Sequence, residues 1–276
     1  MRLICVSDDA VQRSSPYWGE HGLSFLIEAE GKRLLFDTGQ SETILLHNLA
    51  LLGVDPATID AIAISHAHYD HTGGLSALMA QVRPEVPIYA NPDLFRERFS
   101  RKKGKLKEIG LGQSREELAG RLALRLSTAP QEILPGLWTT GEIHERPEVE
   151  GKSDKHFMRE GETLVVDAYR DDMALVLEVK DGLVLLCGCC HAGLLNTVAH
   201  VARTFEQPIT IIAGGLHLTS ATTEELQHIG DVLAEMPALQ RVYPNHCTGE
   251  AAFVALTQIL GPSVVQPFPA GTVLKL

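Results

Sequence analysis

The sequence predicts a layered α/β fold, in which helices cover a mixed β-sheet. Short apolar segments typical of strands, such as 23–28 and 61–64, alternate with segments whose apolar residues recur at helical spacing, such as 41–52. Glycine, proline and polar turn formers separate these segments. The resulting order, β-β-β-α-β-α-β, is typical of layered α/β domains.

The elements follow in order along the chain. Strands are expected at 2–6, 23–28, 33–36, 61–64 and 88–90, then in the strand-like segment 130–141, and finally at 173–179, 183–187, 209–215 and 241–243. Helices are expected at 41–52, 75–81, 194–204 and 222–234. Gly53 closes the first of these helices, and Asp181-Gly182 forms a hairpin turn in the second half.

We expect residues 1–276 to form a single domain with two irregular parts. The first is an insertion at about 91–127, which is rich in lysine and arginine within an otherwise acidic chain. It is either a solvated surface helix and loop or a cap that brings positive charge to an anionic substrate. The second is a polar segment at about 141–162 without periodicity, which we interpret as a mobile loop.

Composition restricts the class of protein. A hydrophobic content of 45% with 21% charged residues is ordinary for a soluble globular chain, and a net charge of −11 argues against a nucleic-acid binder. No segment approaches 18 consecutive apolar residues, so we expect no membrane association. Five cysteines, three of them crowded at 187–190, favour reduced thiols and a cytoplasmic location. The oligomeric state is left open, including a homo-oligomer.

The segment 61–74, AIAISHAHYDHTGG, predicts a metal site. An apolar strand is followed within a few residues by His66, His68, Asp70 and His71. Imidazoles and carboxylates are ligands of zinc, iron and manganese, and alternate residues of an extended segment or its first turn converge on one point. With 12 histidines in the whole chain, a chance cluster of this density is a poor explanation.

Four ligands in one loop do not complete two metal sites, so we expect others from later strand ends. Three histidines follow apolar strands and lie near glycine, which allows close backbone approach: His191 in GCCHAG, His217 in GGLHL and His246 in NHCTG. His191 and His246 are the preferred ligands, and Cys189 or Cys190 is the alternative to His191. We prefer His191 because a thiolate ligand, although suited to zinc, oxidises readily near iron. For His217 we favour contact with substrate or proton transfer.

HAHYDH fits the HxHxDH signature of the metallo-β-lactamase superfamily, and Phe36-Asp37-Thr38-Gly39 resembles the strand-end motif that precedes that signature. The resemblance implies a four-layer αββα sandwich with one metal on His66 and His68 and a second on Asp70 and His71. It also implies one or two divalent metal ions, with zinc favoured over manganese or iron.

Two further assignments follow from the same resemblance. Asp37 would orient the histidine loop without binding metal, and His246 would be the superfamily's last histidine ligand. In typical hydrolases of the superfamily, the strand before His191 ends in an Asp or Cys ligand, whereas this chain has GCCHAG with no Asp. That departure puts a symmetric two-metal arrangement in doubt.

Six segments between residues 20 and 249 resemble one branch of the superfamily, the 7,8-dihydropterin-6-yl-methyl-4-(β-D-ribofuranosyl)aminobenzene 5′-phosphate synthases. These segments are EHGLSFLIE, LLFDTGQS, SHAHYDHTGGL, GCCHAG, GGLHL and NHCTG. The branch implies condensation of a pterin pyrophosphate with an aminobenzene ribosyl phosphate, helped by a metal Lewis acid. An anionic, phosphorylated small molecule would then meet the basic segment, including Lys103 and Lys105, and His21 would face the site.

Two alternatives are kept. The first is a hydrolase acting on a phosphoester, thioester or lactone, in which Asp70 orients a metal-bound water and His217 protonates the leaving group. The second is a metal-binding or redox protein without hydrolytic turnover, suggested by the cysteines at 187–190. Redox relatives usually have a glutamate where this chain has His68, and they add a flavin domain, so this alternative is ranked last.

Overall fold

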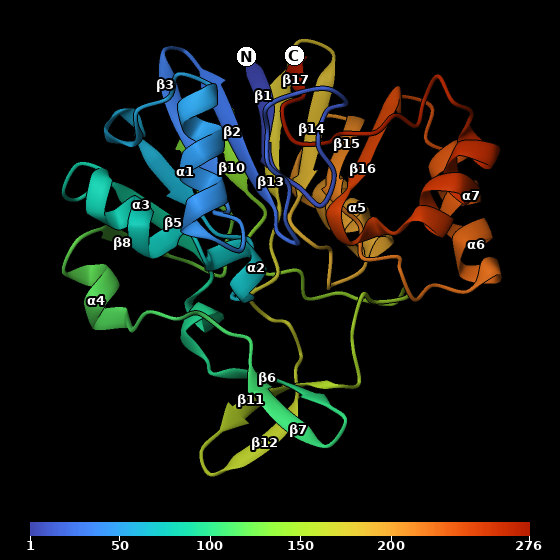
Figure 1. Ribbon diagram of the computed structural model, residues 1–276. Helices are drawn as coiled ribbons and strands as arrows, with labels where there is room; N and C mark the ends of the chain where they lie inside the picture. The colour runs from blue at the N-terminus through green and yellow to red at the C-terminus, as the bar shows by residue number, and fades with distance from the viewer. The chain divides into compact units, whose positions relative to one another are not determined.

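Two units, each built around its own β-sheet, make up the computed structural model, which describes residues 1–276 (Figure 1). Unit 1 comprises Met1–Thr128, Lys152–Asp171 and Pro269–Leu276. Unit 2 comprises Ala129–Gly151 and Asp172–Phe268. The chain therefore leaves and re-enters unit 1 twice before it ends. The expectation of a single domain stays a prediction.

The main sheet of unit 1 has seven strands in the order β17-β1-β2-β3-β4-β5-β8. Their bounds are β1 Arg2–Ser7, β2 Ser24–Ala29, β3 Lys32–Phe36, β4 Ala61–Ala63, β5 Pro87–Ala90, β8 Ala123–Leu126 and β17 Val273–Lys275. The strands from β17 to β3 pair antiparallel, and those from β3 to β8 pair parallel. At the β2–β3 turn, Glu30 and Gly31 both have positive φ, a conformation that glycine adopts without strain.

Helices cover one face of this sheet. They are α1 Glu42–Leu51, the single turn α2 Tyr69–Thr72, α3 Leu75–Gln81 and α4 Arg115–Ala119. The Ser41 hydroxyl caps α1 by accepting from the Ile44 N–H. Leu45 of α1 and Leu75 of α3 join an apolar cluster with strand residues such as Leu35, and burial of this cluster holds the helices on the sheet.

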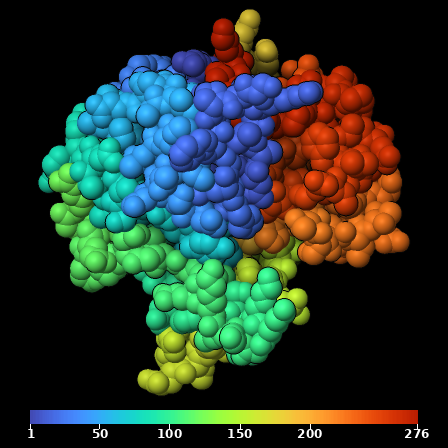
Figure 2. Space-filling model, in the orientation of Figure 1, coloured from blue at the N-terminus to red at the C-terminus, as the bar shows by residue number.

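A second, smaller sheet projects from the rest of unit 1. Its order is β12-β11-β6-β7, with bounds β6 Arg98–Lys102, β7 Lys105–Glu108, β11 His156–Glu160 and β12 Thr163–Val166. All neighbours pair antiparallel. Figure 2 shows the green β6–β7 hairpin and the yellow-green β11–β12 hairpin as a protrusion of this unit.

This small sheet corrects two expectations. The basic segment at about 91–127 does not form the expected surface helix, because it contains the hairpin β6–β7. Its last part is not an insertion, because it supplies β8, an edge strand of the main sheet. The segment expected to be a loop at 141–162 contains β11 in its last part. The two hairpins β6–β7 and β11–β12 form one sheet because β6 pairs with β11, and β8 pairs with β5; these contacts between distant segments leave no local periodicity to read.

Unit 2 contains a six-stranded sheet in the order β16-β15-β14-β13-β10-β9. Its strands are β9 Glu132–Leu134, β10 Leu137–Thr139, β13 Leu175–Val179, β14 Gly182–Cys187, β15 Ile209–Gly215 and β16 Arg241–Asn245. Helices α5 Leu194–Thr204, α6 Thr223–Ala234 and α7 Glu250–Leu260 pack on it through an apolar cluster. The strands β14, β15 and β16 are parallel, so their carboxyl ends meet at one edge.

Most expected elements agree with the observed ones within two residues. The helices α3 and α5 and the strand β15 have the expected bounds. Helix α7 and strand β17 were not expected. No helix of the chain has the length and apolar character needed to cross a membrane.

Candidate metal centre

The histidine loop of unit 1 is fixed by backbone contacts with the turn after β3. The Thr38 N–H donates to the His71 carbonyl at 2.7 Å, and the Gly73 N–H donates to the Gly39 carbonyl at 2.9 Å. A Cβ on Gly73 would lie 1.9 Å from the Gln40 carbonyl oxygen. The glycine that follows the histidine motif is therefore needed for this close approach of two loops.

The loop brings its polar side chains together in a buried cluster. His66, His68, Asp70 and His71 are all less than 9% exposed. The His66 ring lies 4.6 Å from the His68 ring and 4.2 Å from the His71 ring, centroid to centroid. An Asp70 carboxylate oxygen lies 3.8 Å from His71 Nε2. Three imidazoles and one carboxylate in a buried loop form a donor set suited to a divalent metal.

Asp37 and Ser65 orient two of these rings. Asp37 Oδ2 lies 2.7 Å from His71 Nδ1 and accepts from the Ser65 hydroxyl at 2.7 Å. The Ser65 hydroxyl is also 2.9 Å from His66 Nδ1. Asp37 is fully buried and has φ of 59°, a conformation that costs energy for a residue other than glycine. These contacts engage Nδ1 of both rings, so Nε2 is the nitrogen that each ring presents to a metal.

His68 has two aromatic neighbours that were not expected from the sequence. The His156 ring lies 5.2 Å from the His68 ring, and the Tyr169 ring lies 5.8 Å from it. His156 Nδ1 is 2.8 Å from the Tyr169 hydroxyl. The sequence analysis did not single out His156, and pairing of β11 with β6 carries this residue to the loop. Burial lowers the pKa of His68 well below its usual value, which keeps the imidazole in the neutral form that binds metal.

A buried arginine cluster lies behind the same loop. Arg98 is 0% exposed and is surrounded by Asp93, Asp167 and Asp171. Asp171 Oδ2 accepts from the Ala67 N–H at 2.8 Å. Burial raises the pKa of Asp171 to about 7, and the adjacent Arg98 charge opposes that rise. Neither residue was singled out from the sequence as part of a site.

The remaining candidates in unit 1 lie at its surface. The His21 side chain is 56% exposed, with Nδ1 3.3 Å from Asp9 and Nε2 3.5 Å from Asp70. Lys103 lies in the β6–β7 turn, and Lys105 is exposed on β7. Lys107, by contrast, contacts the histidine motif. Its Nζ lies 4.6 Å from the ring centroid of Tyr69, which is a residue of that motif.

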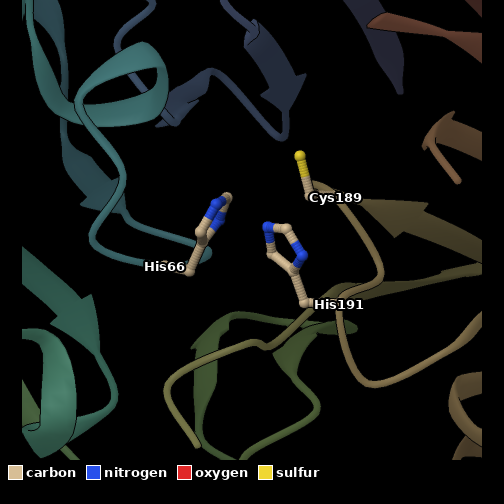
Figure 3. A group of neighbouring side chains, drawn as sticks. All are labelled: His66, Cys189 and His191. Carbon is tan, nitrogen blue, oxygen red and sulfur yellow. The ribbon is translucent and has the colours of Figure 1, made fainter. Parts of the chain in front are cut away.

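In unit 2, His191 and Cys189 lie on the loop that follows β14 (Figure 3). His191 is fully buried, its Nδ1 lies 2.6 Å from the Gly151 carbonyl oxygen, and its ring centroid is 4.3 Å from that of His217. Asp172 Oδ2 accepts from the Ala192 N–H at 2.8 Å and fixes the backbone beside His191. In unit 1, His66 projects from the loop after β4, as the same figure shows.

His217 and His246 follow the neighbouring strands β15 and β16, and both have φ of 47°. Beside them, one ligand atom each from Cys189, His217 and Cys247 lies within 4.8 Å of the others. Burial raises the pKa of Cys247, yet contacts with Cys189 and His217 lower it well below the usual thiol value. His217 Nδ1 is buried without a hydrogen-bond partner. This unit therefore holds sulfur and nitrogen donors at the carboxyl ends of its parallel strands.

A cavity of about 130 Å³ lies beside His217 within unit 2. Its walls include Leu194, Leu195, Leu216, Leu218 and Ile229, and its polar lining includes Glu148, Glu150, Glu225 and His228. Glu148 is bound by His228 at 2.9 Å. Three carboxylates make this cavity a poor site for a phosphate and suit it to an uncharged group.

The fold and the histidine loop define the class of protein. Residues 17–189 match the model of the metallo-β-lactamase superfamily, and the chain belongs to that superfamily. It is 32% identical to a Methanocaldococcus jannaschii protein named 7,8-dihydropterin-6-methyl-4-(beta-D-ribofuranosyl)-aminobenzene-5'-phosphate synthase, over 90% of this chain and 88% of that one. The predicted superfamily and the predicted resemblance to this branch are both confirmed.

Solved structures agree with this assignment. One, described as a metal-dependent hydrolase of the β-lactamase superfamily, has a TM-score of 0.85 and 27% identity, covering 100% of this chain and 99% of its own. A diphosphatase of the PhnP family has a TM-score of 0.56 and 15% identity, covering 100% and 97%, and shows the fold alone. The prediction of an α/β fold of the metallo-β-lactamase type is confirmed.

Proposed function

We propose that this protein is a metal-dependent enzyme that acts on an anionic, phosphorylated small molecule. The observation that carries the proposal is the buried histidine loop, whose rings are oriented by Asp37 and Ser65. Metal ligands in proteins commonly have such partners on their second nitrogen, whereas surface histidines do not need them. Membership of the metallo-β-lactamase superfamily supports the same assignment.

The proposed ligands are those that the superfamily motif implies. They are His66, His68, Asp70 and His71, with His191 and His246 as further ligands, and Cys189 or Cys190 as an alternative to His191. One or two divalent ions would bind, and the imidazole-rich donor set favours zinc. A bound ion would supply Lewis-acid polarisation of a phosphoryl or carbonyl oxygen and would lower the pKa of a coordinated water.

His217 is the proposed proton donor. Its Nδ1 is buried without a partner and borders the cavity of unit 2. Burial is the largest influence and lowers the pKa of this imidazole, but the hydrogen bond and charge of Cys247, together with Asp172, raise the pKa above its usual value. A protonated imidazole next to a cavity can donate to a leaving group held there.

The substrate class rests on the charge of the surroundings. Lys107 places an ammonium against the histidine loop, whereas the cavity beside His217 is lined by three glutamates. We infer that Lys107 favours an anionic group next to the histidine loop of unit 1, and that the cavity of unit 2 by itself favours an uncharged group. The M. jannaschii relative is named as the synthase of a compound that carries a 5'-phosphate, which supports a phosphorylated ligand for this chain.

The alternative proposal is a hydrolase of phosphoesters, thioesters or lactones. It is supported by the structural relative with 27% identity, which is described as a metal-dependent hydrolase. Both proposals use the same histidine loop. They differ in whether water or an amine-bearing second substrate attacks the substrate bound there.

The first test is elemental analysis of protein purified without chelator, together with a chromogenic phosphodiester assay. About two equivalents of zinc or manganese with turnover would support the hydrolase. One equivalent without turnover would favour the synthase-like reaction. Protein that contains no metal, and takes up none when zinc is added, would contradict the proposed function.

Replacing Asp37 by asparagine is expected to weaken zinc binding by about 10- to 100-fold, because the charged partner of His71 Nδ1 is lost. The measurement is competition with a chelating dye. Asp60→Asn is the control, because Asp60 binds Lys32 and Arg83 at the surface of the same unit. Equal zinc affinity in Asp37→Asn and the wild type would contradict the orienting role.

Replacing Lys107 by glutamine is expected to weaken the binding of pyrophosphate, used as an anionic probe, by about fivefold. One partly solvated charge contact is worth about 1 kcal/mol, and the effect should shrink in high salt. Calorimetry of the zinc-loaded protein measures it. Lys103→Gln and Lys105→Gln test the two lysines that the sequence analysis expects to contact the anionic substrate. Lys180→Gln, which is distant from Lys107 in the sequence, is the control. A larger loss for Lys180→Gln would refute this assignment.

A further inference from the structure

Arg98 is a fully buried arginine in a chain segment that otherwise carries exposed cations. Its Nε donates to Asp167 Oδ2 at 3.0 Å, and its Nη2 lies 2.7 Å from Asp171 Oδ1 and 3.3 Å from Asp93 Oδ2. Its Nη1 donates to the carbonyls of Asp93 and Arg96. Burying a charge is costly unless it is paired and hydrogen-bonded, so a cluster this complete requires an explanation.

The cluster reaches the histidine loop through one carboxylate. Asp171 uses Oδ1 for Arg98 and Oδ2 for the backbone N–H of Ala67, at 2.8 Å. Ala67 is the residue between His66 and His68, and its side chain is 0% exposed. The contact therefore acts on the backbone that carries two histidines, whereas Asp37 and Ser65 act on ring nitrogens.

We propose that Asp171, held in place by Arg98, is a positioning residue for the metal centre. It fixes the peptide between His66 and His68, so that the two imidazoles keep the separation and direction that metal binding requires. Ligating side chains must be held within a few tenths of an ångström by their supporting contacts, and a peptide free to rotate would not do this. This inference rests on the proposed function, because it takes His66 and His68 to be metal ligands.

The position of Arg98 adds a second role for the cluster. Arg98 begins β6, the strand whose hairpin partner β7 carries Lys107. The Asn91 side chain also donates to the Arg170 carbonyl at 3.0 Å, which ties the chain before β6 to the residue before Asp171. The histidine loop and the basic hairpin thus share one anchor within unit 1.

Three variants separate positioning from mere stability. Asp171→Ala removes the acceptor for the Ala67 N–H. Asp171→Asn keeps one acceptor oxygen for the Ala67 N–H, and it replaces the oxygen that faces Arg98 by an NH2 group. Asp93→Ala removes a partner of Arg98 that does not contact the loop, and it is preferred to a change at Asp167, whose neighbour Tyr169 lies against His68.

The measurements are zinc affinity by dye competition and the urea midpoint of the metal-free full chain. We expect Asp171→Ala to bind zinc about 10- to 100-fold more weakly than the wild type. Asp171→Asn should restore affinity to within about threefold, because the acceptor returns. Asp93→Ala should lower the urea midpoint and leave the zinc affinity unchanged. Cobalt-substituted Asp171→Ala should show altered d–d bands.

Two results would overturn the inference: wild-type zinc affinity in Asp171→Ala, or an equal loss in Asp93→Ala. Should Asp171→Ala fail to fold, hydrogen exchange at the Ala67 amide of the metal-free wild type decides. We expect protection of at least about 100-fold, and an unprotected amide would overturn the inference. A wild-type protein that binds no zinc would instead refute the proposed function.

Discussion

His66→Ala is expected to remove metal from the protein while the fold survives. The substituted side chain belongs to a buried cluster of donors, and loss of one imidazole ligand should weaken metal affinity by on the order of 100-fold or more. Elemental analysis after gel filtration measures the metal content, and circular dichroism reports the fold. His246→Ala is expected to have the same effect.

His144→Ala is the matched control for these variants. Its side chain is 63% exposed, near Glu142, and no ligand role is proposed for it. It should keep the wild-type metal content. Full metal content in His66→Ala would show that the ligand assignment is wrong, and an unfolded His66→Ala protein would shift the test to His66→Gln.

Arg98→Met is expected to be the most destabilising single change, with a loss of about 3–5 kcal/mol in the free energy of unfolding. Removing one member of a buried ion cluster leaves the others charged and uncompensated. Asp167 and Asp171 are both about 1% exposed, so water cannot replace the guanidinium. Urea denaturation of the metal-free protein, with the slope compared as well as the midpoint, measures the loss.

The destabilisation should depend on pH. Burial already raises the pKa of Asp171 to about 7, and Arg98 is the main opposing cause, so its removal raises this pKa further. A carboxyl whose folded-state pKa exceeds its unfolded value stabilises the fold at low pH and loses that contribution as the pH rises through the folded value. The deficit of Arg98→Met should therefore be larger at pH 8 than at pH 5.

Arg33→Met is the control for this second prediction. Arg33 is half-buried and pairs with Glu28 at 3.1 Å and with Thr58. Partly solvated pairs of this kind contribute about 0.2–1 kcal/mol. If Arg98→Met lowered the free energy of unfolding by less than about 1 kcal/mol, the buried cluster would contribute no more to stability than a surface ion pair does.

The sequence was informative where a local pattern decides the structure. Helix α5 follows from apolar residues at helical spacing between glycine and a polar turn, and β15 from an unbroken apolar run. The histidine loop follows from residue types at short spacing. All of these signals lie within about a dozen residues of the chain.

The parts that were missed depend on contacts between distant segments. Arg98 lies in a basic stretch typical of a surface, and it is buried because three aspartates from 93, 167 and 171 surround it. His156 reaches His68 only because β11 pairs with β6, more than fifty residues earlier in the chain. The adjacent pair Asp171-Asp172 before an apolar strand was the one available signal, since acidic residues at a strand start need partners.

The pairing of β17 with β1 constrains the order in which the nascent chain can complete its structure. Arg2 pairs with Lys275, and the Cys5 N–H donates to the Thr272 carbonyl at 3.0 Å. The sheet of unit 1 is complete only after residues 273–275 have left the ribosome, when every residue of unit 2 has already been synthesised. Until then β1 presents an open edge that can pair with another chain. Removal of residues 269–276 should leave that edge open permanently and favour aggregation.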